Sequence, residues 1–350
     1  MRRHLNTLYV TSQGAYLSKD GANIVVSVDR EERGRVPIHQ LGSVIGFGRV
    51  ALSPTAMGFC AEEGVSIAFF SEAGRFLARV EGPVSGNVLL RREQYRRADE
   101  PAARGALVAS IVTGKILGQR AVVRRVLRDH GKSADQHTRD ALQKAEARLT
   151  NCARRTRLPL SDINDVDTLR GIEGEASAVY FGEFNAMVRN PEPTFRFSGR
   201  SRRPPLDALN AMLSFAYALL AQDCRSALEG VGLDPNVGFL HVDRPGRPSL
   251  ALDLMEEFRS GFADRLVLSL INRRQVKARG FETLDGGAVH MNEDTRKALL
   301  VAYQERKRQE LTHPYLDERT SMGLAWHLQA RLLARHLRGD LDAYPAFVWR

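Results

Sequence analysis

The stretch "EGPVSGN" (Glu81–Asn87) divides this 350-residue chain into two parts with different sequence patterns. Before it, short β-branched and aromatic runs such as "NIVVSV" (23–28) are bounded by turn residues, which is typical of strands. After it, apolar residues recur with the 3.6-residue period of helices. Glycine, proline and serine make the stretch itself a linker. We therefore expect an α+β fold with a small N-terminal β-rich domain (1–82), a linker (83–87) and a larger all-α-helical domain (88–350).

Local signals place individual elements within the two parts. The runs "VSIAFF" (65–70) and "RFLARV" (75–80), joined by "SEAG", predict a β-hairpin. Ser53 as a cap and Pro54 in the first turn predict a short helix between strands. In the C-terminal part we expect helices near 88–98, 103–130, 134–153, 163–188, 206–229, 250–275, 292–310 and 317–337.

The chain is strongly basic, with a net charge of +10 from 51 Lys and Arg against 41 Asp and Glu. Residues 1–85 carry only +1 of this surplus and the rest of the chain carries +9. Such a balance suits a polyanionic partner, with nucleic acid as the first candidate and an anionic membrane as the second. Composition alone fits a merely soluble basic protein equally well.

Cysteine usage and hydropathy indicate the compartment. The three cysteines are far apart and form no C-x-x-C pair, which argues against a disulfide framework or a structural zinc site. The first residues contain no apolar signal-peptide core, and the apolar run "AMLSFAYALLA" (211–221) is too short to span a bilayer. We expect a soluble cytoplasmic protein without a membrane partner.

The stretch "LRGIEGEASAVYF" (169–181) has a helical pattern, although each internal glycine costs a helix about 1 kcal/mol relative to alanine. On a helical wheel Glu173 points toward the apolar side, where a carboxylate needs a cation or a hydrogen-bond donor. A partly exposed glutamate paired with an arginine is the simpler alternative. Gly171, Gly174 and Gly182 lie on another flank, where another helix or a ligand is expected to approach closely.

A second acidic feature is "SLALDLMEEFR" (249–259), in which Asp253, Glu256 and Glu257 share one face of a predicted helix. The ordinary alternative is that acids favour the first turns of a helix because of its dipole. Just upstream, His241 ends an apolar run before a turn that contains proline and glycine. A contact between His241 and Asp243 would explain this histidine without any function.

Glutamate, aspartate and histidine together form a mixed oxygen and nitrogen donor set. Such a set suits Mn²⁺ or Mg²⁺ better than a closed zinc site. The three segments are distant in sequence, so the fold has to bring them together. A metal held there activates a water or a 3′-hydroxyl and stabilises charge on a phosphodiester.

The segment "RNPEPTFRFSGRSRRPPLD" (189–207) separates two predicted helices and interleaves basic with aromatic residues. Its candidate nucleic-acid-binding residues are Arg196, Arg200, Arg202 and Arg203, and its aromatic residues are Phe195 and Phe197. Phosphate contact and base stacking would suit single-stranded or frayed nucleic acid. A solvated linker whose phenylalanines pack on the core is an equally good interpretation.

Several of these segments resemble one family over nearly the whole chain. They are "LSPTAMGFCAEEGVSIAFFSEAGRFLARV" (52–80), "LRGIEGEASAVYF", "LNAMLSFAYALL" (209–220), "GLDPNVGFLHVDRPGRPSLALDLMEEFR" (232–259) and "YPAFVWR" (344–350). The chain resembles the Cas-one family, the DNA integrase and endonuclease of CRISPR adaptation, and its likeness is closest to type I-C members. The resemblance implies a β-domain joined to a helical catalytic domain, and a homodimer of which two flank a Cas-two dimer.

The resemblance also implies site residues. Carried over by motif position, a Mg²⁺ or Mn²⁺ ion is held by Glu173, His241 and Glu256, with Asp253 as a further catalytic residue. Some members have aspartate where this chain has Glu256, which leaves open whether Glu256 or Glu257 reaches the metal. Asp253 either acts through a ligand or contacts the nucleophile. Tyr180, close to Glu173 on its helix, is a candidate for orienting water or substrate.

The implied reaction is a transesterification in which the 3′-hydroxyl of a short DNA fragment attacks a phosphodiester of a CRISPR array. Its substrate is double-stranded DNA with single-stranded or branched ends, and the same site cleaves branched DNA. The main alternative is a non-catalytic DNA-binding scaffold in which the acids are structural. A hydrolase of small phosphoesters is disfavoured, because its substrate would not need a charge of +9 on the catalytic domain.

Overall fold

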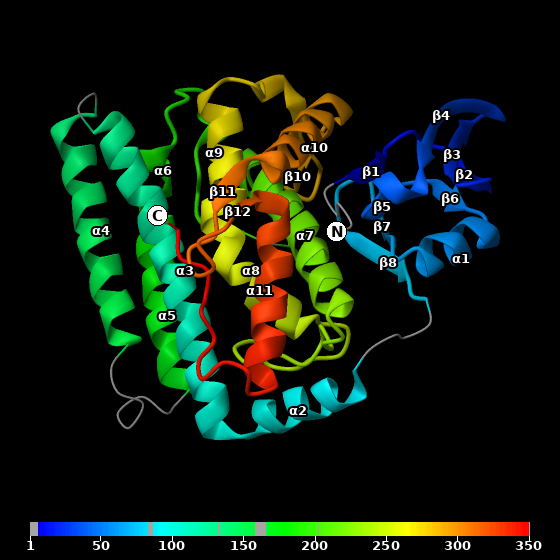
Figure 1. Ribbon diagram of the computed structural model, residues 1–350. Coiled ribbons are helices and arrows are strands. Elements are labelled where there is room, and N and C mark those ends of the chain that lie inside the picture. The colour runs from blue at the N-terminus through cyan, green and yellow to red at the C-terminus, as the bar shows by residue number, and fades with distance from the viewer. Residues whose placement is uncertain (1–5, 83–86, 132–133, 158–165, 202, 350) are drawn as a thin grey trace. The chain divides into compact units, whose positions relative to one another are not determined.

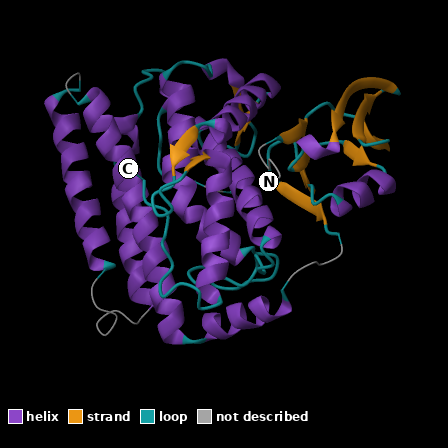
Figure 2. Ribbon diagram, in the orientation of Figure 1, coloured by secondary structure: helices purple, strands orange, loops and turns teal. Residues whose placement is uncertain are grey.

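The computed structural model describes residues 6–82, 87–131, 134–157, 166–201 and 203–349 (Figures 1 and 2). The chain forms two compact units. The first contains Met1–Ser85, Leu300–Gln309 and Ser321–Leu324, and the second contains Gly86–Leu299, Glu310–Thr320 and Ala325–Arg350. Most of the expected linker, residues 83–86, lies outside the described residues.

Within residues 6–82, the first unit contains two four-stranded sheets and the short α-helix α1. One sheet has the order β1 (Thr7–Val10), β5 (Ser43–Phe47), β7 (Ser66–Phe70), β8 (Phe76–Val80), and the other β4 (Glu31–Pro37), β3 (Asn23–Val28), β2 (Ala15–Asp20), β6 (Val50–Leu52). The predicted hairpin is β7 paired antiparallel with β8. Helix α1 (Pro54–Glu62) begins as predicted, because the Ser53 hydroxyl accepts a hydrogen bond from the Ala56 amide at 3.1 Å.

The second unit is mainly helical. Its helices are α2 (Val88–Asp99), α3 (Pro101–His130), α4 (Gln136–Arg155), α5 (Val166–Gly182), α6 (Phe184–Met187), α7 (Ala208–Gly230), α8 (Ser249–Phe258) and α9 (Arg265–Asn272). Helices α10 (Glu293–Arg308) and α11 (Met322–Leu337) follow along the chain. A π-helical segment, Arg259–Asp264, joins α8 to α9, so the predicted helix near 250–275 is one helical rod with a widened turn.

The expectation of an all-α domain needs a correction. Two small hairpins, β9 (Phe281–Thr283) with β10 (Val289–Met291) and β11 (Glu310–Thr312) with β12 (Arg319–Ser321), interrupt the helices (Figure 2). Residues near 317–321, predicted as the start of a helix, belong to this second hairpin. Strands of three residues are too short to show the alternation that identifies a strand in sequence.

Helix α3 is the central helix of the second unit. It packs against α4, α5, α8 and the π-helical segment, as Figure 1 shows for α4 and α5. Helix α3 is long and apolar enough to cross a membrane, but 72% of its most apolar stretch is buried within the protein. Val108, Ile111 and Ile116 contribute to this burial. Its apolar character is therefore that of a core helix.

Candidate metal centre

Glu173 lies on α5 and points toward the core, as the helical wheel predicts. Its side chain is 24% exposed, while Leu169 and Ala176 on the same side are fully buried. One oxygen of Glu173 accepts hydrogen bonds from the Lys115 ammonium and, at 2.9 Å, from the Ser177 hydroxyl. The cation that compensates Glu173 is therefore a lysine of α3 and not the arginine of the simpler alternative.

Glu256 on α8 faces the same lysine. Lys115 Nζ lies 2.8 Å from one Glu256 oxygen, and Arg259 Nη1 donates to the other at 3.1 Å. Burial alone would raise the pKa of Glu256, but the charges of Lys115 and Arg259 outweigh burial and hold it well below its usual range. Glu256 is therefore a permanent carboxylate inside the protein.

His241 is oriented by Asp253, which is completely buried. The imidazole Nδ1 lies 2.7 Å from Asp253 Oδ1, and Asp253 also accepts from the backbone amides of Phe239 and Leu240 at 2.6 Å and 3.0 Å. A carboxylate at Nδ1 favours the tautomer with its proton there, which leaves the Nε2 lone pair free to bind a cation. His241 Nε2 lies 3.9 Å from Glu256 Oε1.

The partner of His241 is therefore Asp253, which is distant in sequence, and not the nearby Asp243 of the structural alternative. Asp243 instead accepts a bond from the Gly238 amide at 3.3 Å. Asp253 was expected among the catalytic residues. Because its oxygens are occupied by three backbone amides and the imidazole, its contacts are those of a residue that positions His241.

Glu257 points away from this cluster and holds the C-terminal segment. Its carboxylate accepts from the Phe347 amide and the Tyr344 hydroxyl, both at 2.6 Å, and from Gln329 Nε2 at 2.9 Å. Burial raises its pKa to about 7 despite these donors. Trp349 Nε1 donates to the Glu257 carbonyl at 2.7 Å, and the Trp349 ring occupies the space beside Gly261, where a Cβ would overlap it at 2.2 Å. Of the two adjacent glutamates, Glu256 is the one that faces Glu173 and His241.

A divalent cation fits this donor set chemically. Two carboxylates and an imidazole held by an aspartate are hard oxygen and nitrogen ligands of the kind that Mg²⁺ and Mn²⁺ take. Within the part of the chain that the structure describes, no three His, Cys, Asp or Glu side chains are gathered closely enough to hold a metal as they stand. The Lys115 ammonium instead occupies the position between Glu173 and Glu256.

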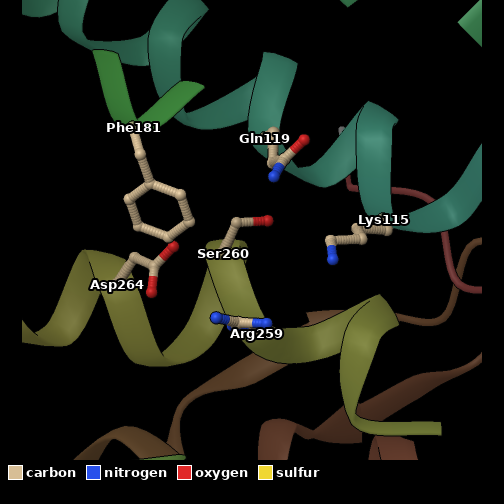
Figure 3. Close-up of a pocket in the computed structure, with 6 residues that line it drawn as sticks. All are labelled: Lys115, Gln119, Phe181, Arg259, Ser260 and Asp264. Atoms are coloured by element: carbon tan, nitrogen blue, oxygen red, sulfur yellow. The ribbon is translucent and has the colours of Figure 1, made fainter. Parts of the chain in front are cut away.

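A cavity of about 10 Å³ adjoins Lys115, and Lys115, Gln119, Phe181, Arg259, Ser260 and Asp264 line it (Figure 3). In Figure 3, Lys115 and Gln119 project from α3 toward the π-helical segment that carries Arg259 and Ser260. Three buried polar atoms, Gln119 Oε1, Arg259 Nε and Ser260 Oγ, have no hydrogen-bond partner among the described residues. The space is polar and suits one water-sized group.

The expected role of Tyr180 in orienting substrate does not fit its position. Its ring is fully buried and its hydroxyl donates to Asp264 at 3.0 Å. The Tyr217 hydroxyl donates to the other oxygen of Asp264. Burial raises the pKa of Tyr180 well above its ordinary value, so the phenol stays protonated. Tyr180 therefore belongs to the packed interior behind Glu173.

The arginine-rich segment 189–207 also differs in part from expectation. Phe195 and Phe197 are buried, which supports the packing alternative over base stacking. Arg200 is half-buried and donates to Asn210 at 2.7 Å. Arg196 and Arg203 are exposed and remain candidates for phosphate contact, whereas Arg202 lies outside the described residues.

The glycine flank of α5 is open rather than packed. A Cβ added at Gly171, Gly174 or Gly182 would meet no other group of the described chain within 4 Å. The expected close approach of another helix is therefore wrong for the described residues. Bare backbone at these positions leaves one side of the helix that carries Glu173 accessible.

Lys115, Gln119 and Arg259 are the site residues that the motif pattern did not single out. Lys115 did carry a signal, because it is the charged residue of the otherwise apolar run "IVTGKILG" (111–118) in a helix. A lysine at such a position is buried only when a carboxylate meets it. Its partners come from α5 and α8, and the sequence of α3 does not indicate them.

Fold and site together define a class: an α+β protein whose helical unit carries carboxylates and an aspartate-held imidazole suited to a hard divalent cation. Residues 8–305 match the family described as CRISPR associated protein Cas1. "CRISPR-associated endonuclease Cas1 2" of Rhodospirillum rubrum is 55% identical, and "CRISPR-associated endonuclease Cas1 1" of Chlorobaculum tepidum is 52% identical, each over 350 residues and 100% of both chains. The chain belongs to the Cas1 family, which confirms the family predicted from its motifs.

Solved structures share the fold. A "Casposase bound to integration product" matches with a TM-score of 0.81 at 21% identity, over 99% of this chain and 94% of that chain. A CAS1 protein from Thermotoga maritima matches with a TM-score of 0.78 at 22% identity, over 97% and 99% of the two chains. These matches confirm the α+β fold class.

Proposed function

We propose that this chain is a divalent-metal-dependent DNA endonuclease and integrase of CRISPR adaptation. The observation that carries the proposal is the convergence of Glu173, Glu256 and the aspartate-held His241 inside a basic protein. Relatives named CRISPR-associated endonuclease at 52% and 55% identity support the enzyme class. The net charge of +10 supports a long polyanionic substrate.

The carboxylates of Glu173 and Glu256 and the Nε2 of His241 would hold Mg²⁺ or Mn²⁺. When bound, the ion supplies charge stabilisation at a phosphodiester and lowers the pKa of a hydroxyl. Asp253 keeps the His241 lone pair available, and Arg259 fixes one oxygen of Glu256. In the reaction, a fragment's 3′-oxygen forms a new bond to phosphorus as the array's bridging P–O bond breaks. The leaving oxygen takes up a proton, and the attacking hydroxyl loses one.

Two substitutions test the site directly. Incubation with branched DNA and Mn²⁺ or Mg²⁺ is expected to give cleavage by the wild type and none by Glu173→Ala or His241→Ala. Asp167→Ala, an exposed carboxylate on the same helix as Glu173, and His137→Ala, an exposed histidine on α4, serve as matched controls. Equal activity in all five proteins would refute the metal site and leave the DNA-binding scaffold.

The exposed arginines of segment 189–207 are proposed to contact DNA phosphates. Combined replacement of Arg196 and Arg203 by alanine is expected to lower the slope of log affinity against log salt by up to about two, because each lost phosphate contact removes about one. Filter binding at several salt concentrations measures this slope. Replacement of Arg33 and Arg75, exposed arginines of the first unit, is the control. An unchanged slope for the first pair would exclude the segment from the DNA path.

The assembly is proposed by analogy with relatives. Solved neighbours include a Cas6-RT-Cas1–Cas2 complex, with a TM-score of 0.78 over 99% of this chain. We infer that this chain forms a homodimer through its β-rich domain (1–82), that two such dimers flank a Cas-two dimer, and that the helical domain (88–350) carries out the chemistry. A type I-C system and a cytoplasmic setting complete the proposal.

A further inference from the structure

Lys115 is a buried cation at the centre of the proposed metal site. It lies among buried apolar residues of α3 such as Ile111, Val112 and Ile116 and is only 5% exposed. Burying an ammonium is costly unless an anion meets it. Here Nζ donates to Glu173 and lies 2.8 Å from Glu256, so one ammonium contacts two carboxylates from different helices.

The position that Lys115 Nζ occupies is the one a shared cation of Glu173 and Glu256 would need. A second cation is also present, because Arg259 Nη1 contacts the far oxygen of Glu256, but the described contacts of Glu173 are with Lys115 and Ser177. If a metal entered while Lys115 stayed in place, two positive centres would compete for the same oxygens. Entry of the metal therefore requires the ammonium to leave.

The structure contains a second place for this ammonium. The cavity of about 10 Å³ beside Lys115 is water-sized, and Gln119 lines it. Gln119 Oε1 is a buried acceptor without a partner among the described residues. Gln119 lies one turn after Lys115 on α3, within reach of a flexible four-carbon side chain. Figure 3 shows both side chains projecting from the same face of the helix.

We propose that Lys115 is the resident counter-ion of the metal-free site, and that metal entry displaces its ammonium into the cavity beside Gln119. The inference rests on the proposed metal site. Lys115 acts as a positioning residue that keeps the two carboxylates together before the metal arrives and lowers the apparent metal affinity by competition. Gln119 accepts the displaced charge.

The test measures Mn²⁺ binding by calorimetry and the melting temperature with and without MnCl₂, on the full-length protein. Lys115→Met keeps the side-chain length without the charge. It is expected to lower the melting temperature of the metal-free protein and to tighten Mn²⁺ binding at least about tenfold, because a competing unit charge is removed. The added metal then raises the melting temperature more than in the wild type. Lys144→Met, at an exposed position of α4, should behave as the wild type.

Gln119→Leu keeps the test decisive if Lys115→Met does not fold without metal. Loss of the acceptor is expected to weaken Mn²⁺ binding several-fold, because the displaced ammonium loses its partner, and to change the metal-free melting temperature little. Unchanged Mn²⁺ affinity in Gln119→Leu, or unchanged or weaker affinity in Lys115→Met, would overturn the inference and leave the proposed function intact. Absence of Mn²⁺ binding by the wild type would overturn both.

Discussion

Replacing Glu256 by glutamine is expected to lower metal-dependent cleavage of branched DNA by on the order of a thousandfold, whereas the same change at Glu257 leaves most activity. Glu256 faces Lys115, His241 and Glu173, so the substitution removes a full negative charge from the proposed ligand set. Glu257 faces the C-terminal segment. Burial raises the pKa of Glu257 to about 7, and its contacts lie outside the proposed ligand set, so we expect loss of its charge to have a smaller effect on activity.

The measurement is the single-turnover rate on a branched DNA substrate with Mn²⁺, compared for the wild type and the two variants. Circular dichroism on each protein separates loss of chemistry from loss of fold. Adjacent glutamates of one helix serve as each other's control, since both substitutions have the same chemistry. Equal losses at both positions, or a Glu256→Gln variant with normal rates, would be incompatible with the assignment of Glu256.

Replacing Glu257 by alanine is expected to lower the free energy of unfolding by roughly 3–5 kcal/mol, a large effect for one substitution. In the wild type, the Phe347 amide and the Tyr344 hydroxyl each donate to the Glu257 carboxylate at 2.6 Å. Alanine would leave both buried donors without this acceptor. Each such orphaned donor costs about 1–3 kcal/mol. Gln329 loses one acceptor but keeps the Pro345 carbonyl at 3.1 Å.

Urea unfolding followed by tryptophan fluorescence measures this change, because Trp349 bonds to the Glu257 carbonyl and reports release of the C-terminal segment. Glu257→Gln retains an acceptor oxygen and should lose clearly less stability. Asp167→Ala, which removes a 78% exposed carboxylate, should change stability by less than about 0.5 kcal/mol. A loss below about 1 kcal/mol in Glu257→Ala would show that the C-terminal segment is held by other contacts.

The periodicity of apolar residues was sufficient to predict most of the fold. Long amphipathic helices and a β-hairpin bounded by turns can be recognised from their own residues alone. The β9–β10 and β11–β12 hairpins were missed, since three-residue strands are specified by their partners. The helical period also placed Glu173 correctly toward the core. It gave no reason to expect that the bare flank of α5 would remain uncovered.

The site itself depended on contacts between distant segments, which a single sequence specifies only weakly. The sequence suggested Asp243, two residues away, as the partner of His241, but the fold places Asp253 of the next helix against it. The choice between Glu256 and Glu257 needed the position of the C-terminal segment. Lys115 was recognisable as an unusual lysine, while its two carboxylate partners lie 58 residues away on α5 and farther away on α8.

The π-helical segment Arg259–Asp264 makes the geometry of this site sensitive to the insertion or deletion of a residue. In a regular α-helix, side chains five residues apart point about 140° away from each other. In the widened turn, Arg259 and Asp264 line the same cavity. The position of Glu256 relative to the hydrogen-bonded pair Tyr180 and Asp264 therefore depends on the number of residues in this turn as well as on side-chain contacts. Deletion of one residue here would convert the widened turn into a regular α-helical turn. Glu256 and the Tyr180–Asp264 pair would then move apart, although none of these side chains had been changed.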